Sequence, residues 1–208
     1  MNDTPFFAPE RLVADEFTIR CYMPGDGSLM AEAVNASYDH LRIFMPWAQP
    51  HTEVVQAEQT VRSWRAKYLL STDFVLGIFS PDNRRLLGSS GFHLREGGLE
   101  NRAAEIGMWI RANAAGEGLG TSVLCAVLEW GFSAWPWDRL TWHCDERNIA
   151  SRCTAEKAGM LYEGRLRGVR LLPDGKRENT LGFAALRSEW KRPVAGVSWY
   201  GRCASVGG

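Results

Sequence analysis

Apolar residues recur along the chain with two different periods, and these periods predict where strands and helices lie. A period of two, or a short apolar run, predicts seven strands, at residues 17–22, 74–80, 86–94, 103–110, 139–144, 160–170 and 179–187. Apolar spacings of three and four predict four helices, which begin near Asp26 or Ser28, at Thr52, at Leu119 and at Asn148.

The connections between these elements predict how the strands pair. Short turns at residues 81–84 and 173–176 predict two antiparallel hairpins, the second with an Asp-Gly turn. A predicted helix joins segments 103–110 and 139–144, so these two strands are expected to be parallel. The predicted fold is α+β, with a mixed, mostly antiparallel central sheet of about seven strands flanked by about four helices.

The glycine-rich loop before the third helix is the clearest chemical signal. Gly116, Gly118 and Gly120 alternate at the start of that helix, where free backbone N–H groups and the helix dipole favour an anion. The loop lacks the Lys-Ser/Thr ending of a P-loop, and no acidic residue ends a suitable following strand as dinucleotide binding requires. A pyrophosphate group outside a nucleoside triphosphate is the remaining ligand.

Several motifs in a fixed order carry a resemblance to a known family. In chain order they are Glu105-Ile106-Gly107-Met108-Trp109-Ile110, Gly116-Glu117-Gly118-Leu119-Gly120, Asn148-Ile149-Ala150-Ser151 and Glu156-Lys157-Ala158-Gly159-Met160. From about residue 11 to residue 190 the chain resembles the GNAT acetyltransferase superfamily, and more narrowly its Rim-type branch of ribosomal-protein N-terminal acetyltransferases. The resemblance implies a three-layer α/β GNAT fold in which the parallel strands splay apart and accept the pantetheine arm of acetyl-CoA.

The same resemblance implies the cofactor-binding residues. They are Met108, Trp109, Ile110, Gly116, Gly118, Leu119, Gly120, Thr121 and Asn148. The first three would pair through their backbone with the pantetheine amides, as an added strand does. Asn148 also suits a helix N-cap, and the two roles are compatible. Residues 38–50, rich in large side chains, are either a wall of the acceptor groove or a loop packed on the core.

Acyl transfer from a thioester to an amine needs a neutral amine, a stabilised oxyanion and a protonated leaving thiolate. Glu105 is predicted to be the base, provided that burial raises its pKa toward neutrality; the alternative is a carboxylate at a strand edge, paired with Arg102. Ser151 matches the serine that the family places near the sulfur, so the resemblance implies a proton donor. His93 is the reserve base. His143 and Cys144 are adjacent on a strand and face opposite sides, so they cannot form a nucleophilic pair.

Three positions depart from the family pattern. Ala115 stands where the family usually has Gln or Arg, so one side-chain contact to the cofactor phosphates is missing. Glu117 places a carboxylate beside the expected pyrophosphate, which is repulsive unless the side chain points into solvent. Met160 replaces the usual Phe. The backbone amides are therefore expected to provide most of the cofactor contacts.

The predicted activity is acetyl-CoA-dependent N-acetylation of a primary amine, by direct attack in a ternary complex. The Rim-type resemblance favours a protein N-terminal α-amine. A small-molecule amine such as an amino acid, a polyamine or an antibiotic remains an alternative, as do another acyl group and a non-catalytic CoA-binding sensor. The loss of Gln or Arg at Ala115 is compatible with the sensor, whereas Glu105 and Ser151 together oppose it.

Composition limits the other classes of function. Lys plus Arg and Asp plus Glu number 24 each, so the net charge is zero, which argues against a nucleic-acid binder that neutralises phosphates. Five cysteines without a Cys-x-x-Cys spacing indicate neither a disulfide framework nor a metal site. No leader or long apolar run is evident, so a cytoplasmic protein without a membrane partner is expected. We expect one domain over residues 1–192 and a tail over residues 193–208. The sequence is compatible with a homodimer and does not decide the oligomeric state.

Overall fold

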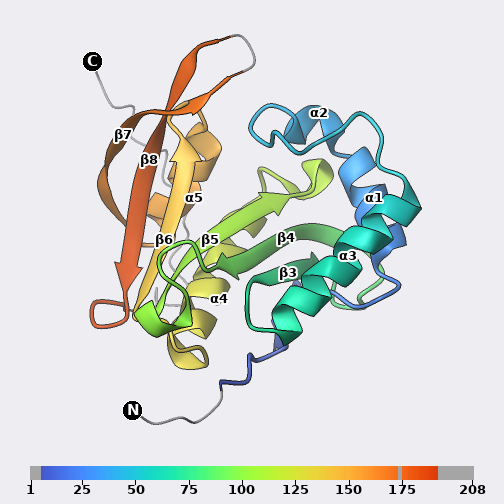
Figure 1. Cartoon of the computed structure of the whole chain (residues 1–208), viewed down its shortest axis with the longest axis horizontal. Helices are drawn as coiled ribbons and strands as arrows, with labels where there is room; N and C mark the ends of the chain where they lie inside the picture. Colours follow the sequence, from blue (N-terminus) through green and yellow to red (C-terminus); the bar gives the residue numbers. More distant parts are fainter. Residues whose placement is uncertain (1–5, 173–174, 192–208) are drawn as a thin grey trace.

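The computed structural model describes residues 6–172 and 175–191, and its strands form one mixed sheet in the order β1-β2-β3-β4-β5-β6-β8-β7 (Figure 1). The strands are β1 (Arg11–Val13), β2 (Thr18–Cys21), β3 (Phe74–Phe79), β4 (Leu86–His93), β5 (Ala103–Ile110), β6 (Arg139–Asp145), β7 (Leu161–Leu171) and β8 (Arg177–Leu186). Neighbouring strands are antiparallel except β5 and β6, which are parallel. The predicted α+β class and the parallel pair are confirmed.

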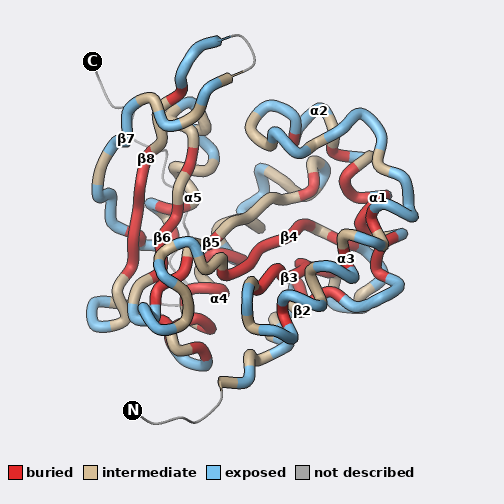
Figure 2. Tube along the Cα trace, viewed as in Figure 1, coloured by how far each residue is buried: buried red, intermediate tan, exposed pale blue. Residues whose placement is uncertain are grey.

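Helices cover both faces of the sheet and create two hydrophobic cores (Figures 1 and 2). They are α1 (Gly27–Asn35), α2 (Tyr38–Leu41), α3 (Val54–Leu69), α4 (Leu119–Ser133) and α5 (Ile149–Lys157), with 3-10 turns at Leu99–Asn101 and Ala112–Ala114. The side chains of β3 alternate between the cores: Leu76 and Ile78 pack with α4, whereas Val75 packs with α1 and α3. Burial on both faces explains why β3 is continuously apolar.

The parallel pair separates after three residues. Ala103–Glu105 of β5 pair with Arg139–Thr141 of β6, and no further pairing between these strands follows in the described chain. Beyond that point β5 continues to pair with β4 as far as Ile110, and β6 continues to pair with β8 as far as Asp145. The sheet therefore opens between residues 106–110 and 142–145, which confirms the splay that the family resemblance implies.

The sequence underestimated the number of elements. The described chain contains eight strands and five α-helices, because β1 has three residues and α2 has four. Segments this short cannot display a period of 2 or 3.6. β1 pairs with the outer edge of β2, so its omission did not affect the predicted order of the remaining strands.

Two helices begin close to the predicted residues but are capped in other ways. Glu53, and not Thr52, is the N-cap of α3, and it forms a capping box with Gln56. Asp26 does occupy the N-cap position of α1, but its side chain makes no cap hydrogen bond. Its carboxylate instead accepts hydrogen bonds from Arg20 and from the Met23 N–H. In α3 the capping box with Gln56 selects Glu53, and at α1 the contacts with Arg20 and Met23 occupy the Asp26 carboxylate.

No helix within residues 6–172 and 175–191 has the length and apolar character needed to cross a membrane. The predicted tail over residues 193–208 and the turn residues Pro173 and Asp174 lie outside the described residues.

Candidate active site

Two cavities meet where β5 and β6 separate. The larger one, of about 850 Å³, opens between β5, α1, α3 and the segment after α2. The smaller one, of about 370 Å³, lies between β5, α4 and α5. Seven residues line both cavities: Phe44, Met45, Met108, Trp109, Trp142, Asn148 and Ser151. A group that passes between the two cavities must contact these residues.

The smaller cavity contains the predicted glycine loop. Gly116 and Gly118 line it and have φ angles of 89° and 95°, a left-handed conformation that residues with a Cβ rarely adopt. Gly118 is the N-cap of α4, and no side chain caps this helix. Its first-turn N–H groups, which have no partner within a helix, are thus available at the wall of the cavity for an anion.

The predicted cofactor residues gather at this cavity, with one exception. Met108, Trp109, Ile110, Gly120, Thr121 and Asn148 line it together with Gly116 and Gly118. Leu119 does not line it and packs against the core on the α4 face. Ala115 lines the cavity, whereas Glu117 is exposed and does not. The carboxylate that would repel a pyrophosphate therefore points away from the expected site.

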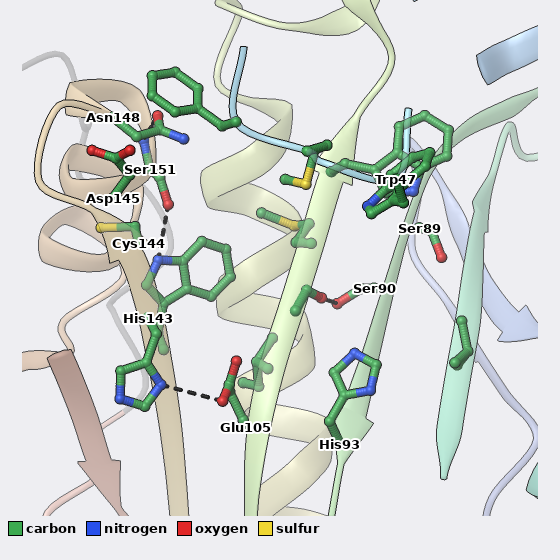
Figure 3. A pocket seen from close by; sticks show the side chains of 18 of the residues that line it. Trp47, Ser89, Ser90, His93, Glu105, His143, Cys144, Asp145, Asn148 and Ser151 are labelled. Carbon is green, nitrogen blue, oxygen red and sulfur yellow. Dashed lines mark hydrogen bonds and ion pairs between the residues drawn. The ribbon is translucent and has the colours of Figure 1, made fainter. Parts of the chain in front are cut away.

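Glu105 lies on the floor of the larger cavity, with both carboxylate oxygens occupied. Arg95 Nη1 donates to Oε1 at 2.5 Å, and His143 Nδ1 lies 3.3 Å from Oε2 (Figure 3). Burial alone would raise the pKa of Glu105, but the hydrogen bond with His143 and the charge of Arg95 outweigh burial and hold the pKa below its ordinary value. The expected increase toward neutrality was wrong, and so was the pairing with Arg102, which binds Asp138.

The same contact shifts the pKa of His143 in the opposite direction. Its hydrogen bond to Glu105 raises the pKa of the imidazole above its usual value, and burial opposes this only in part. His143 and Cys144 lie on opposite faces of β6, as predicted, because His143 contacts Glu105 whereas Cys144 belongs to the core on the α4 face. Burial raises the pKa of the Cys144 thiol, which makes it a poor nucleophile at neutral pH.

A second acid and base pair lines the larger cavity on the far side of Glu105. His93 Nδ1 lies 2.9 Å from Asp73 Oδ1. His93 on β4 and Glu105 on β5 are partners in the strand register, so their side chains share one face of the sheet (Figure 3). Sequence reasoning identified His93 but missed Asp73, because no local pattern links two residues 20 positions apart.

Ser151 lies at the junction between the cavities and contacts Trp142. The Trp142 indole Nε1 donates to Ser151 Oγ at 3.0 Å (Figure 3). The Ser151 backbone N–H donates to Asn148 Oδ1 at 3.0 Å, so Asn148 caps α5 and also lines both cavities. Trp142 is a site residue that the sequence did not reveal, because its alternation on β6 also fits an ordinary core position.

The segment after α2 forms an aromatic wall over the junction. Phe44 and Met45 line both cavities, and Trp47 lines the larger one. The rings of Trp47 and Trp109 lie 6.1 Å apart at 57°. Of the two interpretations of residues 38–50, the geometry therefore supports the wall of a groove.

Comparison with known proteins gives the same assignment as the geometry. A family model described as an acetyltransferase (GNAT) domain matches residues 17–161. The chain belongs to the GNAT acetyltransferases. Members of this family are acyltransferases that use acetyl-CoA, and we conclude that the chain is an acetyl-CoA-dependent enzyme of this class.

Individual relatives and solved structures are similar to the chain over most of its length. The Bacillus subtilis (strain 168) protein named "Putative ribosomal N-acetyltransferase YdaF" is 26% identical over 180 residues, which cover 86% of this chain and 96% of that protein. The structure of RimL, a ribosomal L7/L12 α-N-protein acetyltransferase in complex with CoA, has a TM-score of 0.76 at 20% identity and covers 85% of this chain and 98% of RimL. Microcin C7 self-immunity acetyltransferase MccE, in complex with acetyl-CoA and AMP, has a TM-score of 0.75 at 20% identity, with coverages of 86% and 98%.

Proposed function

We propose that this enzyme transfers the acetyl group of acetyl-CoA to the α-amine at the N-terminus of a protein, by direct attack in a ternary complex. The observation that carries the proposal is the meeting of two cavities at the separation of β5 and β6. The smaller cavity fits the cofactor, and the larger one has room for several residues of an acceptor chain. The relative named as a ribosomal N-acetyltransferase supports a protein acceptor.

The residues of the smaller cavity suit the cofactor in two respects. Among the described residues, no strand pairs beyond Glu105 with the edge of β5 that faces away from β4, so backbone groups of residues 106–110 remain for the pantetheine amides. The amides at the start of α4, after Gly118, would hold the pyrophosphate. Acetyl-CoA, when bound, supplies an acetyl group activated as a thioester.

Two side chains at the junction have roles in this proposal. Ser151 Oγ accepts a hydrogen bond from Trp142, which leaves the hydroxyl proton to be donated toward the sulfur of the thioester. Glu105, kept anionic by Arg95 and His143, attracts the ammonium group of the acceptor toward the floor of the larger cavity. No covalent acyl-enzyme is needed, because the Cys144 thiol keeps its proton.

The experiment is thiol release from acetyl-CoA in the presence of four acceptor classes: peptides with free N-termini, free amino acids, polyamines and aminoglycosides. We expect release with peptides. Release with a small amine alone would replace the proposed acceptor by the small-molecule alternative. If no acceptor class gives thiol release but a thermal-shift assay shows cofactor binding, the non-catalytic CoA-binding sensor is favoured instead.

A further inference from the structure

Four ionisable side chains cross the floor of the larger cavity in a row: Asp73, His93, Glu105 and His143. Asp73 directly precedes β3, His93 ends β4, Glu105 lies on β5 and His143 on β6. Acid and base alternate along the row, and two contacts divide it into an Asp73–His93 pair and a Glu105–His143 pair. The two pairs differ in whether they can accept a proton.

The Glu105–His143 pair is held by its own contacts. Both oxygens of Glu105 have partners, Arg95 at 2.5 Å and His143 at 3.3 Å, and its pKa lies below the ordinary value because these partners outweigh the effect of burial. The same contact raises the imidazole pKa of His143 above its ordinary value. A carboxylate whose oxygens both have partners and whose pKa is lowered is a weak base, and His143 is engaged in holding it.

The Asp73–His93 pair is arranged differently. Burial would raise the pKa of Asp73, but the hydrogen bond with His93 lowers it below the usual range, so the carboxylate is charged and accepts from Nδ1–H. The proton on Nδ1 leaves the lone pair on Nε2. Among the described residues, no hydrogen-bond partner of Nε2 is found. The side chain is 20% exposed and lines the larger cavity.

Gly107 gives His93 the space that this arrangement needs. A Cβ at position 107 would lie 2.8 Å from His93 Nε2, closer than carbon and nitrogen atoms pack. The imidazole therefore lies over the Gly107 backbone, next to the part of β5 that lines the cavity. Nε2 thus lies beside Gly107 on β5, at the wall of the larger cavity.

We propose that His93 is the catalytic base that removes a proton from the acceptor ammonium, and that Asp73 is the positioning residue that orients it. This inference rests on the proposed function. One proton moves from the ammonium nitrogen to Nε2, which converts the neutral imidazole to an imidazolium beside the Asp73 carboxylate. The amine lone pair then forms the C–N bond to the carbonyl carbon, and the C–S bond breaks. The thiolate takes a proton from the Ser151 hydroxyl, which recovers one from the second proton that the nitrogen releases. The imidazolium returns its own proton to solvent.

Charged groups from several elements face His93. Asp73, before β3, and Glu105, on β5, favour the imidazolium. Arg95, just after β4, and His143, on β6, oppose it through their positive charges. Lys67 on α3 acts on Asp73 from the other side. Charges of both signs therefore surround the imidazole.

The test is kcat against pH, with a peptide acceptor at saturating concentration, because kcat reports ionisations of the bound complex. The wild-type enzyme should lose activity as pH falls, because protonation of Nε2 removes the base. His93→Gln should lower kcat by about 100-fold or more and remove that ionisation. Asp73→Asn should lower kcat by about 10-fold and shift the ionisation. Added imidazole should partly restore kcat in His93→Ala, which a purely structural role would not allow.

Control measurements separate the possible outcomes. His51→Gln, at an exposed histidine paired with Glu53, should keep the wild-type profile, and thermal shift with acetyl-CoA should show that each variant is folded. If His93→Gln keeps the wild-type kcat and pH profile, the inference is overturned while the proposed function stands. If the wild-type enzyme acetylates no amine, the proposed function fails and this inference fails with it.

Discussion

At the scale of single residues, the surroundings of Glu105 decide what it can do. Its position on β5 was predicted from the motif, but its partners Arg95 and His143 come from a loop and from another strand. Those contacts lower its pKa instead of raising it. The sequence thus identified the residue but not its protonation state, because the pKa depends on charges that only the fold brings close.

Glu105→Gln should therefore affect acceptor binding more than proton transfer. Removing the negative charge from the cavity floor should raise KM for a peptide amine by about 10-fold, equivalent to about 1.4 kcal/mol, and leave acetyl-CoA affinity unchanged. Steady-state kinetics at several pH values will measure this. A loss of the acid-side ionisation in kcat would instead return the role of base to Glu105.

Ser151→Ala should separate the catalytic and the structural roles of this residue. The cap of α5 uses the Ser151 backbone N–H, so the cap survives, whereas the side-chain hydrogen bonds with Trp142 Nε1 and with the Cys144 thiol are lost. We expect a loss of about 1 kcal/mol in the free energy of unfolding and a fall in kcat of about 10-fold or more. Denaturant titration and thiol release will measure the two. A larger loss of stability with normal kcat would assign Ser151 a structural role alone.

At the scale of elements, β3, β4, β5 and α4 were predictable because each is long enough to show its period. The splay between β5 and β6 was expected only through the family resemblance, since it depends on where pairing between the two strands stops, and the chain carries no local signal for that. Asp73, Arg95 and Trp142 were missed for the same reason. Each becomes a site residue only through contacts with residues 9 to 20 positions away.

Gly118→Ala tests the anion site at the start of α4. A Cβ at this position would meet nothing within 4 Å, so the cost comes from the left-handed backbone, about 1–2 kcal/mol. We expect a matching loss of stability and a fall in acetyl-CoA affinity of about 10-fold or more, measured by calorimetry. Gly164→Ala is the control, because its Cβ also meets nothing and its φ is not positive. Equal cofactor affinity in Gly118→Ala and the wild type would contradict the proposed anion site.

At the scale of the whole molecule, the zero net charge conceals ion pairs concentrated around the larger cavity. Asp145 and Glu178 line it and share Arg147. The hydrogen bonds from Arg147 lower the pKa of Asp145 from 3.8 to about 2. A carboxyl group whose pKa is lowered by folding contributes stability above its unfolded pKa, and this contribution disappears as pH falls through the folded pKa.

Asp145→Asn should therefore make the free energy of unfolding less dependent on pH in acid. Between about pH 4 and pH 2 the wild-type protein should lose on the order of 1–2 kcal/mol through this group, and the variant should lack that component. It should also be less stable at neutral pH, because Arg147 loses a charged partner. Urea titrations across this range measure the effect, with the exposed Asp15→Asn as control. If the free energy of unfolding falls equally steeply with pH in the wild type and in Asp145→Asn, the contribution assigned to Asp145 is contradicted.

The central claim is that acetyl transfer occurs to an α-amine at the junction of the two cavities. The most direct measurement is mass spectrometry of two peptides of identical sequence, each containing an internal lysine, after incubation with enzyme and acetyl-CoA. One peptide has a free N-terminus and the other a formylated one. We predict a single acetyl group, located on the α-amine, in the free peptide and none in the formylated peptide. Equal acetylation of the internal lysine in both peptides would contradict the claim. Acetylation of a small amine, with neither peptide acetylated, would contradict it as well.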